Sequence, residues 1–289
     1  MSLLETFERD GYVILKGIVD LEIIPNLREQ LLADVGYDFI GNKTLSYFLT
    51  CPKLYKYQFH PRIVEALVAI CGPRVYYIND IDLRFNRTET SGPQKGWHID
   101  AGSELARFVP YLFDKKYKFM KVGIYLQNNS FEYGGGIDVI VGGHKSFRNF
   151  GSRVRNLIAY FVDNWALAMF RKKIQVPINA GDCVIFDSRI PHRSSPATAK
   201  NGSLVSVERS KIVLYWDVAG RLDDAKNFIL NSTVRAVTES DSFESFSYLG
   251  HNFPDSYPPE YIDLVGSVGP IVIAGPESNN RRFFQIDKC

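Results

Sequence analysis

Within residues 77–85, YINDIDLRF, apolar and charged side chains alternate along the chain. Ile81, Leu83 and Phe85 fall on one face of an extended segment, and the charged side chains between them fall on the other. Because a period of two is typical of a strand with one face in the core, this stretch predicts a half-buried β-strand.

Five further short runs are predicted to be strands, the first of them with the same alternation, and they are bounded by Gly, Pro, Asn or Ser. They are KVGIYLQ (121–127), GIDVIVGG (136–143), QVPI (175–178), CVIFDS (183–188) and KIVLYWDV (211–218). Short strands at this density, separated by turn residues, favour a β-sandwich or jelly roll over a parallel α/β sheet.

Helices are predicted on either side of these strands. Residues 22–35 repeat apolar side chains at helical spacing, at Ile23, Ile24, Leu27 and Leu31, with Asp20 as the predicted cap. Residues 60–71 predict a second helix that Gly72 and Pro73 end.

The later part of the chain has no convincing linker. Residues 150–172 are predicted to form a helical insertion, and residues 219–289 a C-terminal segment that wraps or covers the core. We therefore expect a single domain over residues 1–289.

The composition narrows the classes of partner. The 34 Lys and Arg residues nearly balance the 32 Asp and Glu residues, which gives no support for nucleic-acid binding. The longest apolar segment, 157–170, is interrupted by Asp163 and Asn164 and is too short to span a bilayer. No Cys-x-x-Cys pair occurs and the N-terminus is acidic, so we expect reduced thiols in a cytoplasmic protein with no membrane partner. The cysteines are Cys51, Cys71, Cys183 and Cys289.

Residues 96–104, GWHIDAGSE, hold two metal-ligating side chains at positions i and i+2. His98 and Asp100 would point to the same side of a strand, and His192 follows the predicted strand 183–187 as a candidate third ligand. Two histidines and one carboxylate are the facial set that binds Fe(II) and leaves coordination positions open. The same donors also form a catalytic zinc set, and with five histidines the pattern can arise by chance.

A basic residue that could bind a carboxylate lies after His192 in the sequence. Arg209 opens the predicted strand RSKIVLYW and can offer a two-pronged donor to a carboxylate, with the hydroxyls of Ser194 and Ser210 nearby. The alternatives are that Arg209 is an exposed residue at the start of a strand, or that Lys211 serves in its place.

Together these segments resemble the phytanoyl-CoA dioxygenase family of Fe(II)- and 2-oxoglutarate-dependent oxygenases. The resemblance runs in order from about residue 7 to residue 218. It is carried by FERDGYVILKGIVD, WHID, KVGIYLQNNSFEYGGGIDVIVGGHKSF, GDCVIFDSRIPHRSS and RSKIVLYW. The chain departs from the family pattern in having VGGH for PGSH and a longer loop between His192 and Arg209.

The resemblance implies a mainly β fold with flanking helices around a double-stranded β-helix, a jelly-roll or cupin-like core. It implies that His98, Asp100 and His192 bind Fe(II), and that 2-oxoglutarate and O2 are cosubstrates. Arg209 would pair with the distal carboxylate of 2-oxoglutarate with the help of Ser194, and His144 would be structural. Because Asp100 is a carboxylate, hydroxylation is favoured over halogenation.

The expected substrate is a small molecule, and hydroxylation of an unactivated C–H bond in natural-product tailoring is favoured over fatty-acid catabolism. Arg84, Arg107 and Trp216 are candidate contacts for a polar or anionic group. One alternative is a zinc-dependent hydrolase on a cupin-like barrel, with a base such as Glu104. Another is a barrel that binds a dicarboxylate without catalysis.

Overall fold

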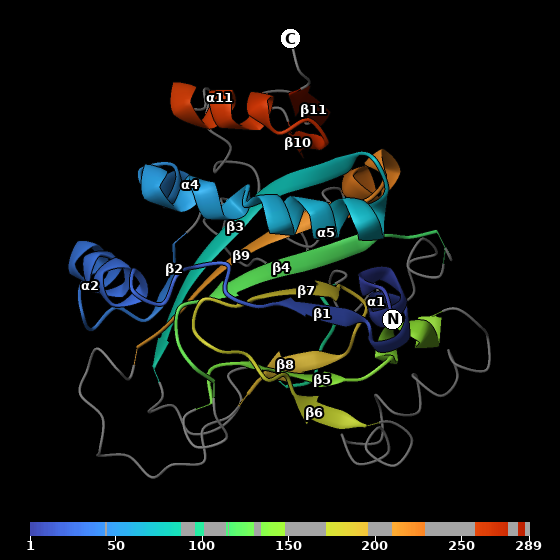
Figure 1. Cartoon of the computed structure of the whole chain (residues 1–289), viewed down its shortest axis with the longest axis horizontal. Coiled ribbons are helices and arrows are strands. Elements are labelled where there is room, and N and C mark those ends of the chain that lie inside the picture. Colours follow the sequence, from blue (N-terminus) through green and yellow to red (C-terminus); the bar gives the residue numbers. More distant parts are fainter. Residues whose placement is uncertain are drawn as a thin grey trace, which may run out of the picture. The chain divides into compact units, whose positions relative to one another are not determined.

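A computed structural model describes most of the chain (Figure 1). The described residues are 1–43, 45–87, 96–100, 114, 116–129, 134–147, 172–195, 210–228, 258–276 and 283–286. The chain divides into two compact units. The first comprises Met1–Asn42, Leu83–Ile99 and Gly123–Tyr215, and the second comprises Lys43–Asp82, Asp100–Val122 and Trp216–Cys289.

The first unit contains the smaller of two sheets and part of the larger one. In the larger one, β1 (Tyr12–Leu15) pairs antiparallel with β7 (Cys183–Asp187), and the order continues through β4 (Phe119–Tyr125), β9 (Ser210–Ala219) and β3 (Val75–Arg87). The boundaries between the units fall within β4, β9 and β3, so each of these strands contributes residues to both units. The strands predicted at 77–85, 121–127, 183–188 and 211–218 are confirmed.

The smaller sheet has the order β6–β5–β8 and carries one of the predicted ligands. Strand β5 (Ile137–Ile140) pairs antiparallel with β6 (Lys173–Gln175) and with β8 (His192–Ser194), and Val139 lies opposite His192. Figure 1 shows this sheet beside β1 and β7.

Apolar side chains from both sheets of the first unit form one core. Its buried members are Tyr125, Ile137, Val139, Val176, Ile178, Val184, Phe186, Ile190 and Val213. Each apolar side chain of this size contributes about 1.5–3 kcal/mol when buried, so the sheets are held together mainly through this layer. Two mostly antiparallel sheets around one core, with helices beside them, confirm the predicted jelly-roll class.

Helices α1 (Leu3–Asp10) and α2 (Ile24–Val35) also belong to the first unit. The predicted start of α2 is wrong. Asp20 does not cap the helix: Ile23 occupies the N-cap position without a side-chain hydrogen bond, and Pro25 stands in the first turn. Ile23, predicted on the buried face, is 39% exposed, whereas Ile24, Leu27 and Leu31 are buried.

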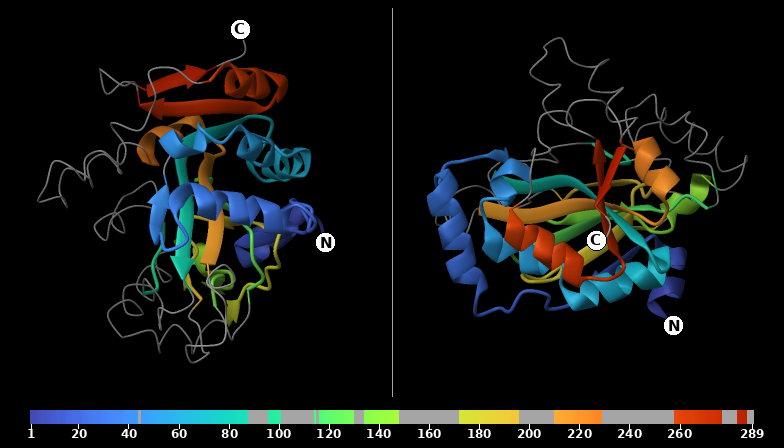
Figure 2. Two further views of the ribbon diagram at one scale, coloured as in Figure 1. Left: turned by 90° about the vertical axis from the view of Figure 1, so that its left-hand side faces the viewer. Right: turned by 90° about the horizontal axis from the view of Figure 1, so that it is seen from above.

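The second unit holds helices α3 (Leu45–Phe48), α4 (Pro52–Gln58), α5 (Pro61–Cys71) and α11 (Pro259–Ser267). Helix α5 confirms the prediction for residues 60–71: His60 caps it by accepting from the Arg62 N–H, and Gly72 ends it. Strand β10 (Ile271–Pro276) pairs parallel with β3 and antiparallel with β11 (Phe283–Ile286), and Figure 2 shows α11 beside both. The ring of Tyr261 on α11 packs against Phe48, Tyr55 and Phe59.

Some sequence predictions fall outside the described residues. One is the helical insertion, of which residues 150–171 are not described. Another is most of the C-terminal segment 219–289. The single domain over residues 1–289 also stays a prediction. Cys51, Cys71 and Cys183 are buried free thiols, as predicted, and Cys289 is not described. Within the described ranges, no helix is long and apolar enough to cross a membrane.

Candidate functional site

A short backbone bridge brings His98 and His192 together. The amide of each residue donates to the carbonyl of the other at 2.9 Å, and the centroids of the two rings lie 4.3 Å apart. His192 is the first residue of β8, and the turn before it is fixed by the buried ion pair of Arg189 with Asp187 at 2.7 Å. Burial acts to raise the pKa of Asp187, but Arg189 outweighs this effect and holds that pKa below its usual value.

Both imidazoles are oriented by a carbonyl two residues earlier. Nδ1 of His98 lies 2.8 Å from the Gly96 carbonyl, and Nδ1 of His192 lies 3.0 Å from the Ile190 carbonyl. A carbonyl oxygen can only accept, so Nδ1 is the protonated nitrogen in each neutral ring. In this tautomer Nε2 is the unprotonated nitrogen, which is the one with a lone pair that can bind a metal ion.

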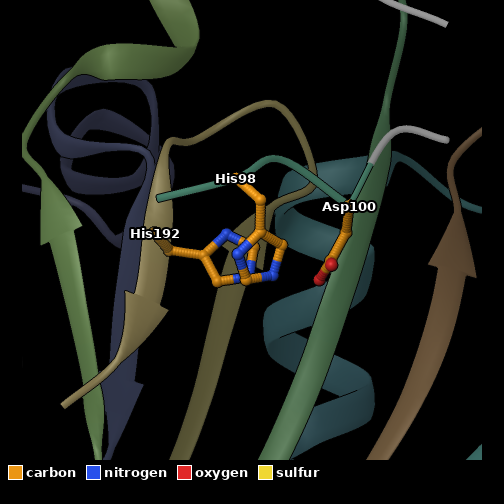
Figure 3. Close-up of side chains that lie close together, drawn as sticks. All are labelled: His98, Asp100 and His192. Carbon is orange, nitrogen blue, oxygen red and sulfur yellow. The ribbon is translucent and has the colours of Figure 1, made fainter. Parts of the chain in front are cut away.

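Asp100 completes the set from two positions beyond His98. One potential ligand atom from each of the three residues lies within 4.8 Å of the other two, and Figure 3 shows the three side chains converging. His192 is buried, while His98 and Asp100 are half-buried. Within the described ranges this is the group of three or more His, Cys, Asp or Glu residues placed to hold a metal. Two imidazole nitrogens and one carboxylate fit Fe(II), and they fit Zn²⁺ as well.

A second layer of contacts supports the histidines. The edge of Phe186 lies against His192 with ring centroids 4.9 Å apart. The ring of Trp97, next to His98 in the chain, is contacted by Lys173 at 5.1 Å and by Arg193 at 4.9 Å. Such cation–π contacts contribute about 0.5–2 kcal/mol each and restrain the segment that carries His98.

Arg193 is itself held in place by β5. Its Nε donates to Oδ2 of Asp138 at 2.9 Å, and the hydroxyl of Ser195 donates to Oδ1 of the same carboxylate at 2.7 Å. Asp138 therefore connects the residues on both sides of Ser194 to the smaller sheet.

The residues predicted to bind 2-oxoglutarate are only partly described. Ser194 is half-buried on β8, opposite Ile137, whereas Arg209 lies outside the described residues. Lys211, two positions beyond Arg209, is 9% exposed, and burial lowers its pKa to about 8. A Cβ atom on Gly135 would overlap the stem of Lys211, so the stem runs directly over this glycine.

The predicted substrate contacts fall in different environments. Arg84 lies over the ring of Tyr215 at 5.6 Å, and the Tyr215 hydroxyl is 2.6 Å from the Tyr125 hydroxyl. Trp216 is fully buried and packs near Tyr77, so the structure places its ring in the core of the second unit. Arg107 and Glu104 lie outside the described residues.

His144 belongs to a 3-10 turn, Gly143–Phe147, and is buried. Its Nε2 lies 3.2 Å from the carbonyl of Glu8, and a Cβ atom on Gly11 would overlap its Nδ1. The ring therefore packs against the end of α1, where Gly11 adopts a φ of 86°.

The sequence reasoning missed two features, of which the second touches the site. These are the paired hydroxyls of Tyr125 and Tyr215, and Lys121, whose ammonium group approaches Asp100. In the run 121–127, Lys121, Gly123 and Tyr125 share the face opposite the apolar one. A cation, a glycine and an aromatic ring on one strand face were the signal available.

The model of the phytanoyl-CoA dioxygenase (PhyH) family matches residues 7–201, more than half of the chain. The chain belongs to this family. No curated protein matches it in sequence. The PhyH family uses Fe(II) with 2-oxoglutarate and O2 as cosubstrates, as the sequence predicted, and the His98–Asp100–His192 donor set fits that metal.

Several solved structures resemble this PhyH protein. One is SnoN, described as the non-heme alpha ketoglutarate dependent epimerase from nogalamycin biosynthesis: 14% identity, TM-score 0.51, covering 75% of this chain and 81% of that chain. Another is SnoK, the alpha ketoglutarate dependent carbocyclase from the same biosynthesis: 16% identity, TM-score 0.50, covering 76% and 84%. A third is AviO1 from Streptomyces viridochromogenes Tue57: 14% identity, TM-score 0.50, covering 75% and 93%. At these identities the similarity shows the fold alone.

Proposed function

We propose that this PhyH protein is an oxygenase that hydroxylates an unactivated C–H bond of a small metabolite. The observation that carries the proposal is the convergence of one ring nitrogen from each of two histidines and one carboxylate oxygen within 4.8 Å. Both histidine tautomers are already fixed for metal binding by backbone carbonyls, so the site needs little reorganisation when a metal binds.

In this proposal His98, Asp100 and His192 hold Fe(II), which supplies the oxygen activation that C–H hydroxylation requires. The protein contributes the geometry. The backbone bridge fixes the spacing of the histidines, Phe186 shields the His192 ring from water, and Trp97 restrains the segment before His98. The carboxylate of Asp100 occupies the third protein position, which supports hydroxylation over halogenation.

Arg209 and Ser194 are proposed to bind the distal carboxylate of 2-oxoglutarate. Ser194 lies two residues beyond His192 on β8, which supports this role. Lys211 is the described cation closest in sequence to Arg209. The contributions of Arg209 and Lys211 to 2-oxoglutarate binding are therefore to be measured separately.

The substrate is proposed to be a natural product or its precursor. SnoN and SnoK, which share the fold, act in nogalamycin biosynthesis, and a related structure contains SnoN with Fe3+, alpha ketoglutarate and nogalamycin RO. Arg84 and Arg107 remain proposed substrate contacts. The prediction for Trp216 is wrong, because its ring is fully buried beside Tyr77 and has no surface to offer a substrate.

The test is an anaerobic titration of the metal-free protein with Fe(II) and 2-oxoglutarate, followed by the visible metal-to-ligand charge-transfer band. His192→Ala is expected to abolish the band, and His60→Ala, which removes a histidine at the start of α5, is expected to leave it unchanged. Arg209→Met is expected to raise the Kd for 2-oxoglutarate at least tenfold, and more than Lys211→Met does. A larger effect of Lys211→Met would assign the carboxylate to Lys211.

The same preparation separates the alternatives. A hydroxylase consumes 2-oxoglutarate and releases succinate when a substrate is present. A zinc hydrolase would show no charge-transfer band and would remain active without oxygen. A dicarboxylate-binding protein would show the band but release no succinate with any member of a metabolite library.

A further inference from the structure

We propose that Lys121 is a positioning residue for Asp100, held in place by the buried carboxylate of Asp217. The inference rests on the proposed metal site and adds a residue to it. All three residues belong to the second unit.

Lys121 is an unusual residue for its position. It is the third residue of β4, and every other residue of that strand is buried. Its side chain keeps only 20% of its surface exposed, and burying an ammonium group costs free energy unless an anion lies close to it. The position therefore calls for a carboxylate partner, and the structure supplies two.

The ammonium group lies between these two carboxylates. Its Nζ is 3.4 Å from Oδ1 of Asp217 on β9 and 3.8 Å from Oδ2 of Asp100. Asp217 is 1% exposed and lies on a strand of the sheet, so its position is fixed, whereas the side chain of Asp100 is 21% exposed and lies outside the strands. Lys121 thus connects a rigid carboxylate to one that has room to rotate.

This arrangement restrains Asp100 without weakening the site for a divalent cation. A lone ammonium group near a metal ion would repel it. Here the negative charge of Asp217, 3.4 Å away, offsets the positive charge of Lys121. A carboxylate has two oxygens, so one can face Lys121 while the other binds a metal. What remains is an orienting effect, and groups that orient metal ligands in this way typically affect metal affinity by about 10–100-fold.

The experiment is a titration of the metal-free full-length protein with Co(II), which stands in for Fe(II) without being oxidised by air, followed by visible absorption. Lys121→Met is expected to raise the Kd for Co(II) 10–100-fold. Lys121→Arg, which restores a cation that can reach both carboxylates, is expected to bring the Kd back to within about threefold of wild type. Lys118→Met is the matched control: it removes a lysine three positions away, which donates to the Ile70 carbonyl. Its Kd should equal that of wild type.

Asp217→Asn provides a second variant, because it removes the charge that anchors Lys121 while leaving Lys121 and Asp100 in place. Its Kd should also rise at least fivefold, and it decides the question if Lys121→Met does not fold. A purely structural role would lower the unfolding temperature of the metal-free variants without changing the Kd of the folded protein. A Kd within twofold of wild type in folded Lys121→Met, or in Asp217→Asn in its place, overturns the inference.

The proposed function fails in a different way. If wild-type protein binds no Co(II), or if His192→Ala binds it as tightly as wild type, the metal site itself is wrong. If wild type binds and His192→Ala does not, the metal site stands, and the Lys121 variants alone decide this inference.

Discussion

Replacing Lys211 by Met is expected to make the metal-free protein more stable. Lys211 is 9% exposed, and burial lowers its pKa from 10.5 to about 8. In the described part of the chain no carboxylate forms an ion pair with it, so the desolvation of its charge is not offset. A pKa difference of this size corresponds to about 3 kcal/mol, at about 1.4 kcal/mol for each tenfold change in proton affinity. Methionine fills a similar volume and carries no charge.

The pH dependence gives this expectation a definite sign. Between pH 8 and 10.5 the unfolded chain keeps the proton on Lys211 while the folded chain releases it. The loss of stability caused by burying the charged Lys211 is therefore complete below pH 8. It falls as the pH rises and disappears above pH 10.5. About half of it remains near pH 9.2, so the advantage of Lys211→Met should shrink from about 3 kcal/mol at pH 7 to about 1.5 kcal/mol there.

Urea unfolding of metal-free protein at pH 7 and pH 9.2 measures this difference. Lys172→Met, which replaces an exposed lysine, should change the free energy of unfolding by less than about 0.5 kcal/mol at either pH. If Lys211→Met is no more stable than wild type at pH 7, or gains equally at both pH values, the desolvation argument is refuted. A confirmed gain would mean that the protein keeps a destabilising cation in its core for a reason other than stability.

Three further outcomes are expected. Gly123→Ala would place a methyl group 2.5 Å from Cε1 of Tyr215, so urea unfolding should show a loss of about 1–3 kcal/mol; unchanged stability would mean that the tyrosine moves freely. Asp138→Ala removes the acceptor shared by Arg193 and Ser195 and should lower the free energy of unfolding by about 1–3 kcal/mol. Ser195→Ala removes one of these hydrogen bonds and should lower it by about 1 kcal/mol. Equal losses in the two variants would contradict the shared role of Asp138. A metal ion at 100 times its Kd should raise the free energy of unfolding by about 2.7 kcal/mol, an increase that a chelator reverses and that a variant without a metal ligand does not show.

Local patterns predicted the strands because alternation depends on a spacing of two residues, and the same spacing places the two proposed metal ligands of residues 96–104 close together. The alternation in 77–85 and 121–127 corresponds to β3 and β4, and the spacing of His98 and Asp100 brings both side chains to His192. The predicted start of α2 is wrong because Pro25, and not Asp20, stands in the first turn of the helix. Proline is tolerated in the first turn of a helix, where an amide donor is not needed, and α2 begins beside it.

Features that depend on distant pairing left no local signal. Strand β10 pairs with β3 from the other end of the chain, and nothing in IVIAGP shows that it joins that sheet. The same holds for Lys121 and Asp217, which meet only because β4 and β9 are neighbours. The tautomers of His98 and His192 depend on carbonyls whose directions follow from the turns before them.

The backbone bridge between His98 and His192 joins residues that lie 94 positions apart in the chain. Closing a loop of that length costs about 4 kcal/mol of chain entropy before any contact between the two residues is gained. The bridge is therefore expected to form late in folding, after the sheets on either side of it have assembled. If the proposed site holds a metal, a nascent chain whose residue 192 is still inside the ribosome offers two of the three ligands, so metal binding is expected to follow the assembly of the two sheets.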